Sequence, residues 1–364
     1  MKWSISLGEF AGIKVHVHLT FFLLLGFVGF SYWIEKPDIL FMLSGISFIL
    51  LIFLCVVLHE YGHALTARRF GVKTKDITLL PIGGVARLEE IPNNPVQELW
   101  IAIAGPAVNI VISIGLLGTL LVNHTLVPVS EWTLSTGSFL QRLLVINLFL
   151  VGFNLIPAFP MDGGRILRAL LAIRMDYARA TQFAVYIGQG LAFMMGFIGL
   201  FTNPFLLFIA AFVWIGATSE NNMVQMKSSL DGVPVSRIMY RDYKSLAPND
   251  VLASAVAMIL ETSQQDFPVI QDQQLIGILT RTDLINGLSQ RGRQSPVRES
   301  MQTEFPTIHL SEMLDAAFQK MQASPNPTLP VLDDDKKLVG ILTTENVGEF
   351  VMIQSAMNTT RNRA

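Results

Sequence analysis

Long apolar segments dominate the first part of the chain, and an ordinary mixture of polar and apolar residues replaces them in the last third. The apolar part covers residues 18–220 and the more polar part covers residues 227–350. A helix that crosses a bilayer needs about 20 mostly apolar residues. Six segments are predicted to be transmembrane helices: 19–33, 39–67, 99–122, 139–157, 183–201 and 204–217. The pattern therefore predicts an α-helical polytopic membrane domain at 1–220, with a linker at 221–232.

Basic residues near the ends of these segments indicate their orientation, because cytoplasmic loops carry an excess of lysine and arginine. One side of the membrane would hold Lys36 and at most Arg142 in addition. The other side would hold Lys2, Lys14, Arg68, Arg69, Lys73, Lys75, Arg87, Arg165, Arg168, Arg174 and Arg179. We therefore expect both termini, the loop 68–98 and the segment after Asp162 to be cytoplasmic.

The loop 68–98 is unusual because it contains the apolar, partly alternating stretch 77–85. This stretch predicts short β-strands that dip towards the membrane. Unpaired backbone N–H and C=O groups are costly in lipid, so such strands must be buried in protein or paired. The sequence therefore predicts a small membrane-associated β segment beside the helices.

The last third of the chain repeats itself. "SRIM" at 236–239 matches "RESM" at 298–301, "FPVI" at 267–270 matches "LPVL" at 329–332, and "GILTRTDL" at 277–284 matches "GILTTENV" at 340–347. Each copy is predicted to form a strand, a helix, two strands and a helix. The order, period and "GILT" signature resemble a tandem pair of α/β CBS domains. The pair would cover 233–350, with copies at 233–290 and 295–350 and a tail at 351–364.

Composition narrows the function further. Hydrophobic residues make up 51% of the 364 residues and charged residues only 15%, which is typical of a membrane protein. The net charge of −2 gives no indication of nucleic-acid binding. Cys55 is the single cysteine, so neither an intramolecular disulfide nor a cysteine-based metal site is expected. The N-terminus lacks the features of a cleaved secretory signal, so the first apolar segment is expected to remain as a span.

The stretch "HEYGH" at 59–63 places His59, Glu60 and His63 at the end of an apolar segment. Residues four apart lie on one face of a helix, so the two imidazoles can bind one metal ion. In an H-E-x-x-H site the glutamate acts as the general base and does not bind the metal. Ionisable residues within a membrane span are costly and usually functional. The alternative is that these residues are merely solvated at the cytoplasmic interface.

A third ligand is needed, because a catalytic zinc normally has three protein ligands. Asp162 is the only carboxylate in the fourth apolar segment and its extension. It follows two prolines and precedes Gly163 and Gly164, which together favour irregular backbone. We therefore expect Asp162 to complete the site; taken alone, it would be an ordinary Asp-Gly turn.

The pairing of "HEYGH" with "NLIPAFPMDG" at 154–163 resembles the site-2 protease family of intramembrane zinc metalloproteases. The resemblance covers about residues 8–220 and, with the appended CBS domains, is similar to the prokaryotic branch that includes a sporulation protease. It implies His59, His63 and Asp162 as ligands of one Zn²⁺ and Glu60 as the catalytic base. Met161 replaces the leucine that usually precedes the aspartate, which is a mild apolar change.

Substrate-binding residues are also implied by the resemblance. Asn154 would contact the substrate backbone near the scissile bond; helix–helix hydrogen bonding is its alternative role. Asn109, in "AGPAVN", would support the active site, although helix packing through the small residues is also expected there. The segment 81–88, with Gly83, Gly84 and Val85, would hold an unwound substrate by strand addition. A plain β-hairpin is the alternative.

The CBS resemblance implies an adenine nucleotide between the two copies, with a Thr and an Asp after each "GIL" strand as its contacts. The first copy has Thr280 and Asp283; the second has Thr343, but Asn346 replaces the aspartate. An amide still hydrogen-bonds to hydroxyl groups. Homodimerisation or docking without a nucleotide is the alternative role of the pair.

Together these features predict a zinc endopeptidase in a prokaryotic cell membrane. Its substrate would be a single-span membrane protein, such as an anti-sigma factor or a membrane-bound transcription factor precursor. Two other classes stay open: a CBS-regulated membrane transporter and a proteolytically inactive membrane scaffold. A transporter would distribute polar residues along a pathway, whereas here they concentrate at one depth. The presence of Glu60 argues against an inactive scaffold.

Overall fold

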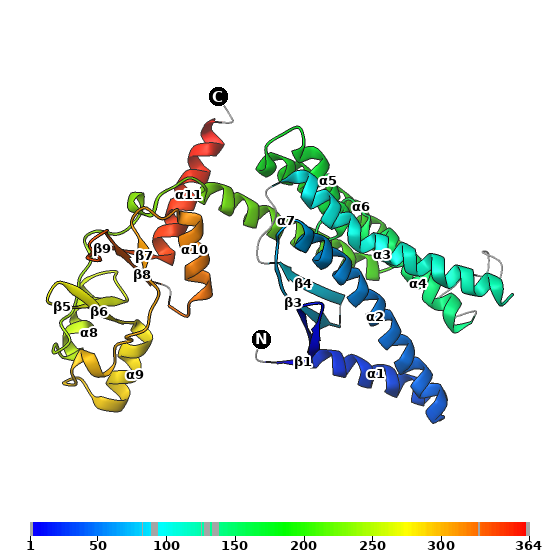
Figure 1. Ribbon diagram of the computed structural model, residues 1–364, viewed down its shortest axis with the longest axis horizontal. Coiled ribbons are helices and arrows are strands. Elements are labelled where there is room, and N and C mark those ends of the chain that lie inside the picture. The colour runs from blue at the N-terminus through cyan, green and yellow to red at the C-terminus, as the bar shows by residue number, and fades with distance from the viewer. Residues whose placement is uncertain are drawn as a thin grey trace. The chain divides into compact units, whose positions relative to one another are not determined.

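The computed structural model describes residues 3–81, 83–88, 94–124, 126, 132, 138–326 and 328–361. Two compact units divide the chain, one ending at Asn222 and the other beginning at Met223 (Figure 1). Residue 82 of the predicted edge segment, residues 89–93 of the predicted loop, Lys2 and residues 362–364 of the predicted tail lie outside the described residues.

The first unit combines helices with one small sheet. Its elements are β1 (Ser4–Phe10), β2 (Ile13–His18), α1 (Leu19–Glu35), α2 (Ile39–Arg69), β3 (Thr74–Leu80), β4 (Gly83–Leu88), α3 (Pro95–Val122), α4 (Phe139–Asn154), α5 (Asp162–Ala172), α6 (Tyr177–Phe201) and α7 (Phe205–Leu230). Capping residues set several helix starts: Asp38 accepts from the Leu40 N–H, and Asn94 accepts from the Val96 N–H beside Pro95 at the first helical position.

Three of these helices, α2, α3 and α6, are long and apolar enough to cross a membrane. The predicted first and fourth spans correspond to the shorter apolar helices α1 and α4. The predicted sixth span forms part of α7. The helical class of the unit is therefore confirmed, with three candidate spans among the described residues, and the six-span count stays a prediction.

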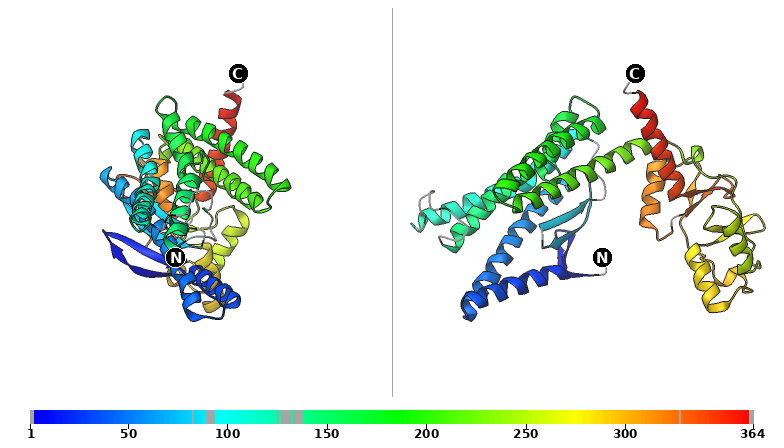
Figure 2. Two further views of the ribbon diagram at one scale, coloured as in Figure 1. Left: turned by 90° about the vertical axis from the view of Figure 1, so that its right-hand side faces the viewer. Right: turned by 180° about the vertical axis from the view of Figure 1, so that it is seen from behind.

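The sheet is larger than the sequence pattern predicted. Its strand order is β1-β2-β3-β4, with β2 and β3 parallel and the other two pairs antiparallel. The strands β3 and β4 form in the predicted loop and lie beside α2 (Figure 2), whereas β1 and β2 come from the N-terminus. Strand β4 is therefore an edge strand of the sheet.

An ion pair joins the last two strands of the sheet. Arg87 on β4 donates hydrogen bonds to both carboxylate oxygens of Asp76 on β3. These hydrogen bonds lower the pKa of Asp76 from its ordinary value, against the opposing effect of burial. The pair fixes the register of β4 against β3, and with it the position of the free edge.

The second unit consists of two similar halves. Its elements are η2 (Val235–Arg237), α8 (Leu252–Glu261), β5 (Phe267–Gln271), β6 (Gln274–Leu279), α9 (Arg281–Arg291), η3 (Val297–Glu299), β7 (Ile308–His309), α10 (Leu314–Ala323), β8 (Thr328–Leu332), β9 (Leu338–Thr343) and α11 (Thr344–Arg361). In the first half a parallel bridge between Leu246 and Val269 replaces the short strand β7. The predicted repeat of strand, helix, strand, strand and helix therefore describes both halves.

The two hydrophobic cores of this unit show the same repeat at the level of side chains. Leu252, Phe267 and Val269 are buried in one core. Leu314, Leu329 and Val331, each 62 positions later, are buried in the other. The second core also contains Leu230, the last residue of α7, so the end of α7 packs within this unit.

Candidate metal centre

Helix α2 brings His59 and His63 together as their spacing predicts. Both side chains are buried, and their Nε2 atoms lie 3.0 Å apart. Two equivalent ring nitrogens at this distance face a common point on one side of α2. The geometry of this one helix therefore brings together two of the three candidate ligand atoms.

Asp162 provides the third candidate ligand atom, beside the two histidine nitrogens. It is the first residue of α5, and its Oδ2 atom lies 3.1 Å from Nε2 of His59 and 3.2 Å from Nε2 of His63. The chain before it folds back tightly, since a Cβ atom on Gly163 would lie only 2.2 Å from the carbonyl oxygen of Ile156. Glycine at this position therefore allows the sharp turn that directs Asp162 towards the histidines.

The other ring nitrogens of the two histidines are held by groups on α3. His59 Nδ1 lies 3.1 Å from Oδ1 of Asn109, and His63 Nδ1 lies 2.7 Å from the backbone carbonyl of Ile101. Both partners are acceptors, so each Nδ1 carries the proton and each Nε2 presents a lone pair. Asn109 therefore acts as an orienting group for His59 and is not itself in the group of three ligand atoms.

The donor set fits a zinc ion. Two lone pairs and the buried Oδ2 of Asp162, which receives no hydrogen bond within the described residues, point at one another. Such an arrangement is unfavourable unless a cation lies between the atoms. Tetrahedral zinc with bonds of about 2.0–2.1 Å separates its ligand atoms by about 3.3 Å, close to the 3.0–3.2 Å observed. Among the described residues, these three form the candidate metal-binding group.

Glu60 lies on α2, directly after His59, and contacts the edge strand β4. Its Oε2 atom accepts a hydrogen bond of 3.2 Å from the backbone N–H of Ala86 on β4. A Cβ atom on Gly84 would lie 2.8 Å from Cγ of Glu60. Gly84 is thus required for β4 to approach α2 so closely. The structure therefore brings the predicted base against Gly84 of the predicted edge. Gly83 precedes it as the first residue of β4, and of Val85 only its backbone in β4 is described.

Asn154 is placed differently from the other predicted site residues. It is the last residue of α4 and is half-buried. Within the part of the chain that the structure describes, its amide forms no hydrogen bond with His59, His63 or Asp162. A contact of Asn154 with substrate therefore stays a prediction.

Gly105 on α3 is a site residue that the sequence analysis did not single out. A Cβ atom there would lie 2.2 Å from Nε2 of His63 and 2.7 Å from Nε2 of His59. The backbone of α3 therefore lies directly against the two ligand nitrogens. The only signal in the sequence was the group of small residues at 104–107, which indicated close helix packing but not its purpose.

Replacing Gly105 with alanine is expected to lower zinc affinity by about 100-fold, the upper end of the range for changed groups around metal ligands. The added methyl group overlaps both ligand nitrogens, whereas alanine in a helix interior is otherwise favoured over glycine by about 1 kcal/mol. Zinc affinity is measured by competition with a chelator. Gly115→Ala on the same helix is the control, because no atom of the described residues lies within 4 Å of its new Cβ. Equal affinities of the two variants would contradict the assignment.

In the second unit, the four predicted nucleotide contacts form two similar pairs. The Thr280 hydroxyl donates to Oδ2 of Asp283 at 2.6 Å, and the Thr343 hydroxyl donates to Oδ1 of Asn346 at 2.9 Å. Each pair also caps the helix that follows, through the N–H of Asp283 or Asn346. The Gln302 amide also donates to Asp283. The structure therefore brings together each Thr with its partner, in the same local geometry.

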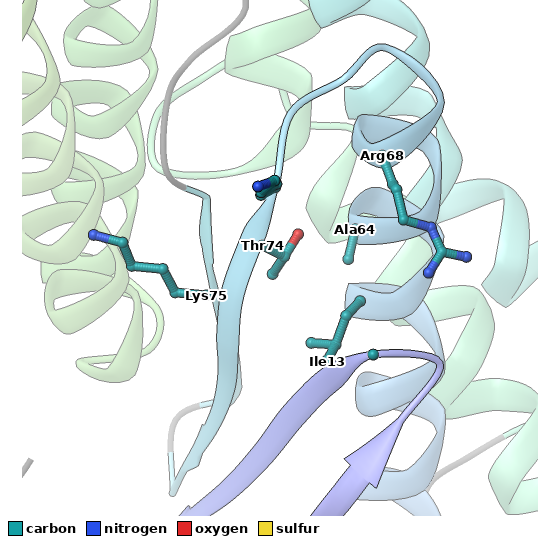
Figure 3. A pocket seen from close by; sticks show the side chains of 7 residues that line it. Ile13, Ala64, Arg68, Thr74 and Lys75 are labelled. Atoms are coloured by element: carbon teal, nitrogen blue, oxygen red, sulfur yellow. The ribbon is translucent and has the colours of Figure 1, made fainter.

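A cavity in the first unit lies between β3, the β1–β2 turn and the face of α2 that carries Ala64 and Arg68 (Figure 3). Lys73 and Lys75 also line it, but the side chain of Lys75 points away from Arg68 (Figure 3). The Arg68 guanidinium donates to the carbonyl oxygen of Ala11. The lining contains none of the three ligands, so the metal centre is a separate feature.

Apolar helices long enough to cross a membrane, a buried candidate metal centre on one of them and a repeated C-terminal unit are together typical of a membrane-bound metal-dependent hydrolase with an appended tandem domain. The sequence profile of Peptidase family M50 matches residues 47–128 and 126–197, and that of the CBS domain matches 235–290 and 297–351. A zinc metalloprotease of Methanocaldococcus jannaschii is 37% identical over 284 residues, covering 77% of this chain and 78% of the relative. The chain belongs to Peptidase family M50, the site-2 protease family of zinc metalloproteases.

Two other proteins are also similar to this chain. A protein of Synechocystis sp. that carries the name of a zinc metalloprotease is 30% identical over 384 residues, covering 98% of this chain and 97% of that protein. The solved structure of a site-2 protease from Methanocaldococcus jannaschii is 41% identical and covers 60% of this chain and 95% of its own, with a TM-score of 0.43.

Proposed function

We propose that this chain cleaves peptide bonds in or near the transmembrane segments of membrane-anchored proteins, with His59, His63 and Asp162 as zinc ligands and Glu60 as general base. The observation that carries the proposal is the convergence of three buried ligand atoms within 3.0–3.2 Å of one another. Two of them lie on α2, a helix long and apolar enough to span a membrane. A hydrolytic site on such a helix suits a substrate that is itself in the membrane.

A zinc ion held by this site would act as a Lewis acid towards the scissile carbonyl and would lower the pKa of a water molecule. Glu60 is adjacent in sequence to His59 and outside the ligand set, so its carboxylate is free to take the proton from the attacking water. The same carboxylate then delivers a proton to the leaving amine. The α3 groups that hold each Nδ1 keep both imidazoles in the tautomer this chemistry needs.

The edge strand β4 is proposed to hold the substrate. A helical peptide hides its backbone in its own hydrogen bonds, so it must unwind before a peptide bond can be cleaved. The free side of β4 can accept an extended peptide by strand addition. The hydrogen bond from the Ala86 N–H to Glu60 supports this arrangement, because it brings β4 against the side of α2 that carries the proposed base. Asn154 would contact the substrate backbone near the scissile bond.

The test of this proposal is cleavage of a panel of single-span membrane proteins by the full chain in lipid vesicles. The wild type should release shortened products, and the variants Glu60→Gln and Asp162→Ala should not. Single-span proteins such as anti-sigma factors or membrane-bound transcription factor precursors are the proposed substrates. Equal cleavage by all three proteins would contradict the proposal.

The CBS pair is proposed to bind an adenine nucleotide and to regulate cleavage from the cytoplasmic side, with dimerisation through the same domains. The repeated Thr–Asp and Thr–Asn pairs support binding, since a threonine hydroxyl can donate to a phosphate oxygen and an aspartate or asparagine oxygen can accept from the ribose hydroxyl groups. Helix α7 supports regulation: it starts in the membrane unit, and its last residue, Leu230, packs in a CBS core.

Titration of the full chain with AMP is expected to show binding, and Asp283→Ala should weaken it about tenfold or more, the effect of losing a hydrogen bond to a charged group. Asn346→Ala should have a smaller effect, because an amide forms weaker bonds. The exposed Asp335, changed to alanine, serves as the control. Failure to bind AMP and ATP at millimolar concentration would remove nucleotide regulation from the proposal without affecting the metal centre.

A further inference from the structure

Arg168 is a buried cation that the proposed mechanism does not use. It lies on α5, six residues after Asp162, and only 1% of its surface is exposed. Its Nε atom donates to Oε1 of Glu98 on α3 at 2.9 Å, and its Nη1 atom donates to Oε1 of Glu220 on α7 at 2.5 Å. Arginine is almost never buried so completely unless it is paired. One guanidinium therefore joins three helices.

The same guanidinium also packs on aromatic rings. It lies 4.9 Å from the ring centroid of Phe159 and 5.0 Å from that of Tyr177, the first residue of α6. Phe159 belongs to the turn that precedes Asp162, and the backbone of this turn contacts the first glycines of α5: a Cβ atom on Gly164 would lie 2.6 Å from the backbone of Phe159. The turn and the start of α5 thus form one compact piece, which Arg168 attaches to its surroundings.

Arg168 holds α5 at a different height, and on a different face, from Asp162. Six residues of α-helix correspond to about 9 Å along the axis and about 240° around it. The two side chains therefore leave α5 on different faces and at different heights. Asp162 and the tight backbone contacts of Gly163 and Gly164 hold the first turn of α5. The contacts of Arg168 with Glu98 and Glu220 hold the same helix at a second point on another face, and so oppose its rotation about its axis.

We propose that Arg168 is a positioning residue for the metal centre: paired with Glu98 and Glu220, it fixes the rotation of α5 and so holds Asp162 within reach of His59 and His63. The proposal rests on the metal centre proposed above. A merely structural role would lower the stability of the protein without changing the ligand geometry of the folded molecule.

The test uses the full chain with Arg168→Lys and Glu220→Gln. Lysine keeps the charge but loses the planar fork that pairs with two carboxylates at once. Glutamine keeps the size of Glu220 and removes its charge. Each variant should lower Zn²⁺ affinity by about 10–100-fold, the range for groups that orient metal ligands. Each should also change the visible spectrum of the Co²⁺-substituted protein, which reports ligand geometry. The exposed Arg174, changed to lysine, is the control and should match the wild type in both.

The outcomes distinguish a failure of the positioning role from a failure of the proposed metal centre. Wild-type affinity and spectrum in both variants would overturn the positioning role, and so would a loss of affinity that only follows a lower unfolding temperature of the metal-free protein. Asp162→Ala, measured alongside, tests the centre. If that variant keeps its zinc affinity, the proposed centre is wrong; if it loses zinc while Arg168→Lys does not, only the positioning role is wrong.

Discussion

Glu60→Gln is expected to reduce kcat by a factor of about 10²–10⁴, the usual contribution of a general base, while leaving zinc content unchanged. Glutamine has nearly the same shape as glutamate and can still accept the hydrogen bond from the Ala86 N–H. It therefore keeps the packing against Gly84 and loses only the ability to accept and deliver a proton. The measurement is the rate of substrate cleavage in vesicles, together with the zinc content of the purified protein.

The control for this variant separates proton transfer from strand binding. Binding of a substrate to the Glu60→Gln protein, measured by co-purification, should be retained because the edge strand is unchanged. A wild-type rate in this variant would show that another group serves as the base. Loss of zinc together with activity would instead place Glu60 among the groups that hold the metal.

Asp162→Ala is expected to remove zinc and to abolish cleavage. One of three ligands is lost, and alanine leaves two neutral imidazoles, which are too few for a catalytic zinc site. The loss of activity should exceed that of Glu60→Gln, because the metal and its activation of water are lost together. Zinc content measured after dialysis against a chelator distinguishes the two variants: Glu60→Gln retains the metal and Asp162→Ala does not.

The exposed Asp231 in the second unit, changed to alanine, provides a control with the same chemical change outside the candidate ligand set. It should keep both zinc and activity. Near-stoichiometric zinc in the Asp162→Ala protein would contradict the ligand set, whatever its activity. Zinc loss with full activity would contradict the metal-dependent mechanism.

Residue spacing predicted only part of the candidate metal centre. His59 and His63 lie four residues apart on one helix, so local geometry alone predicted that their rings would meet. Asp162 lies about a hundred residues further along the chain. Its predicted role depended on the need for a third ligand and on the prolines and glycines around it, and the structure places its Oδ2 atom within 3.1–3.2 Å of Nε2 of both histidines. The assignment of zinc ligation itself stays a proposal.

Other features depended on contacts that no local pattern contains. The sequence predicted strands in the loop 68–98, but β2 pairs with β3 although about 60 residues separate them. The N-terminal strands were therefore missed. Asn109 was predicted as active-site support, and the structure shows its oxygen at His59 Nδ1. Gly105 and Arg168 were not singled out for the site, because a glycine and an arginine acquire such roles only from what packs against them.

The sequence by itself determined the helical membrane unit, the CBS repeat, the candidate edge segment at 81–88 and the two halves of the metal motif, since each follows from a short-range period, a composition or a spacing along one element. Only the tertiary structure decided which backbone lies against the ligands, that the edge strand β4 contacts Glu60, and which charges surround Arg168. The physical reason is that burial and hydrogen bonding between distant segments depend on how helices and strands pack, and packing distances are set by the whole fold.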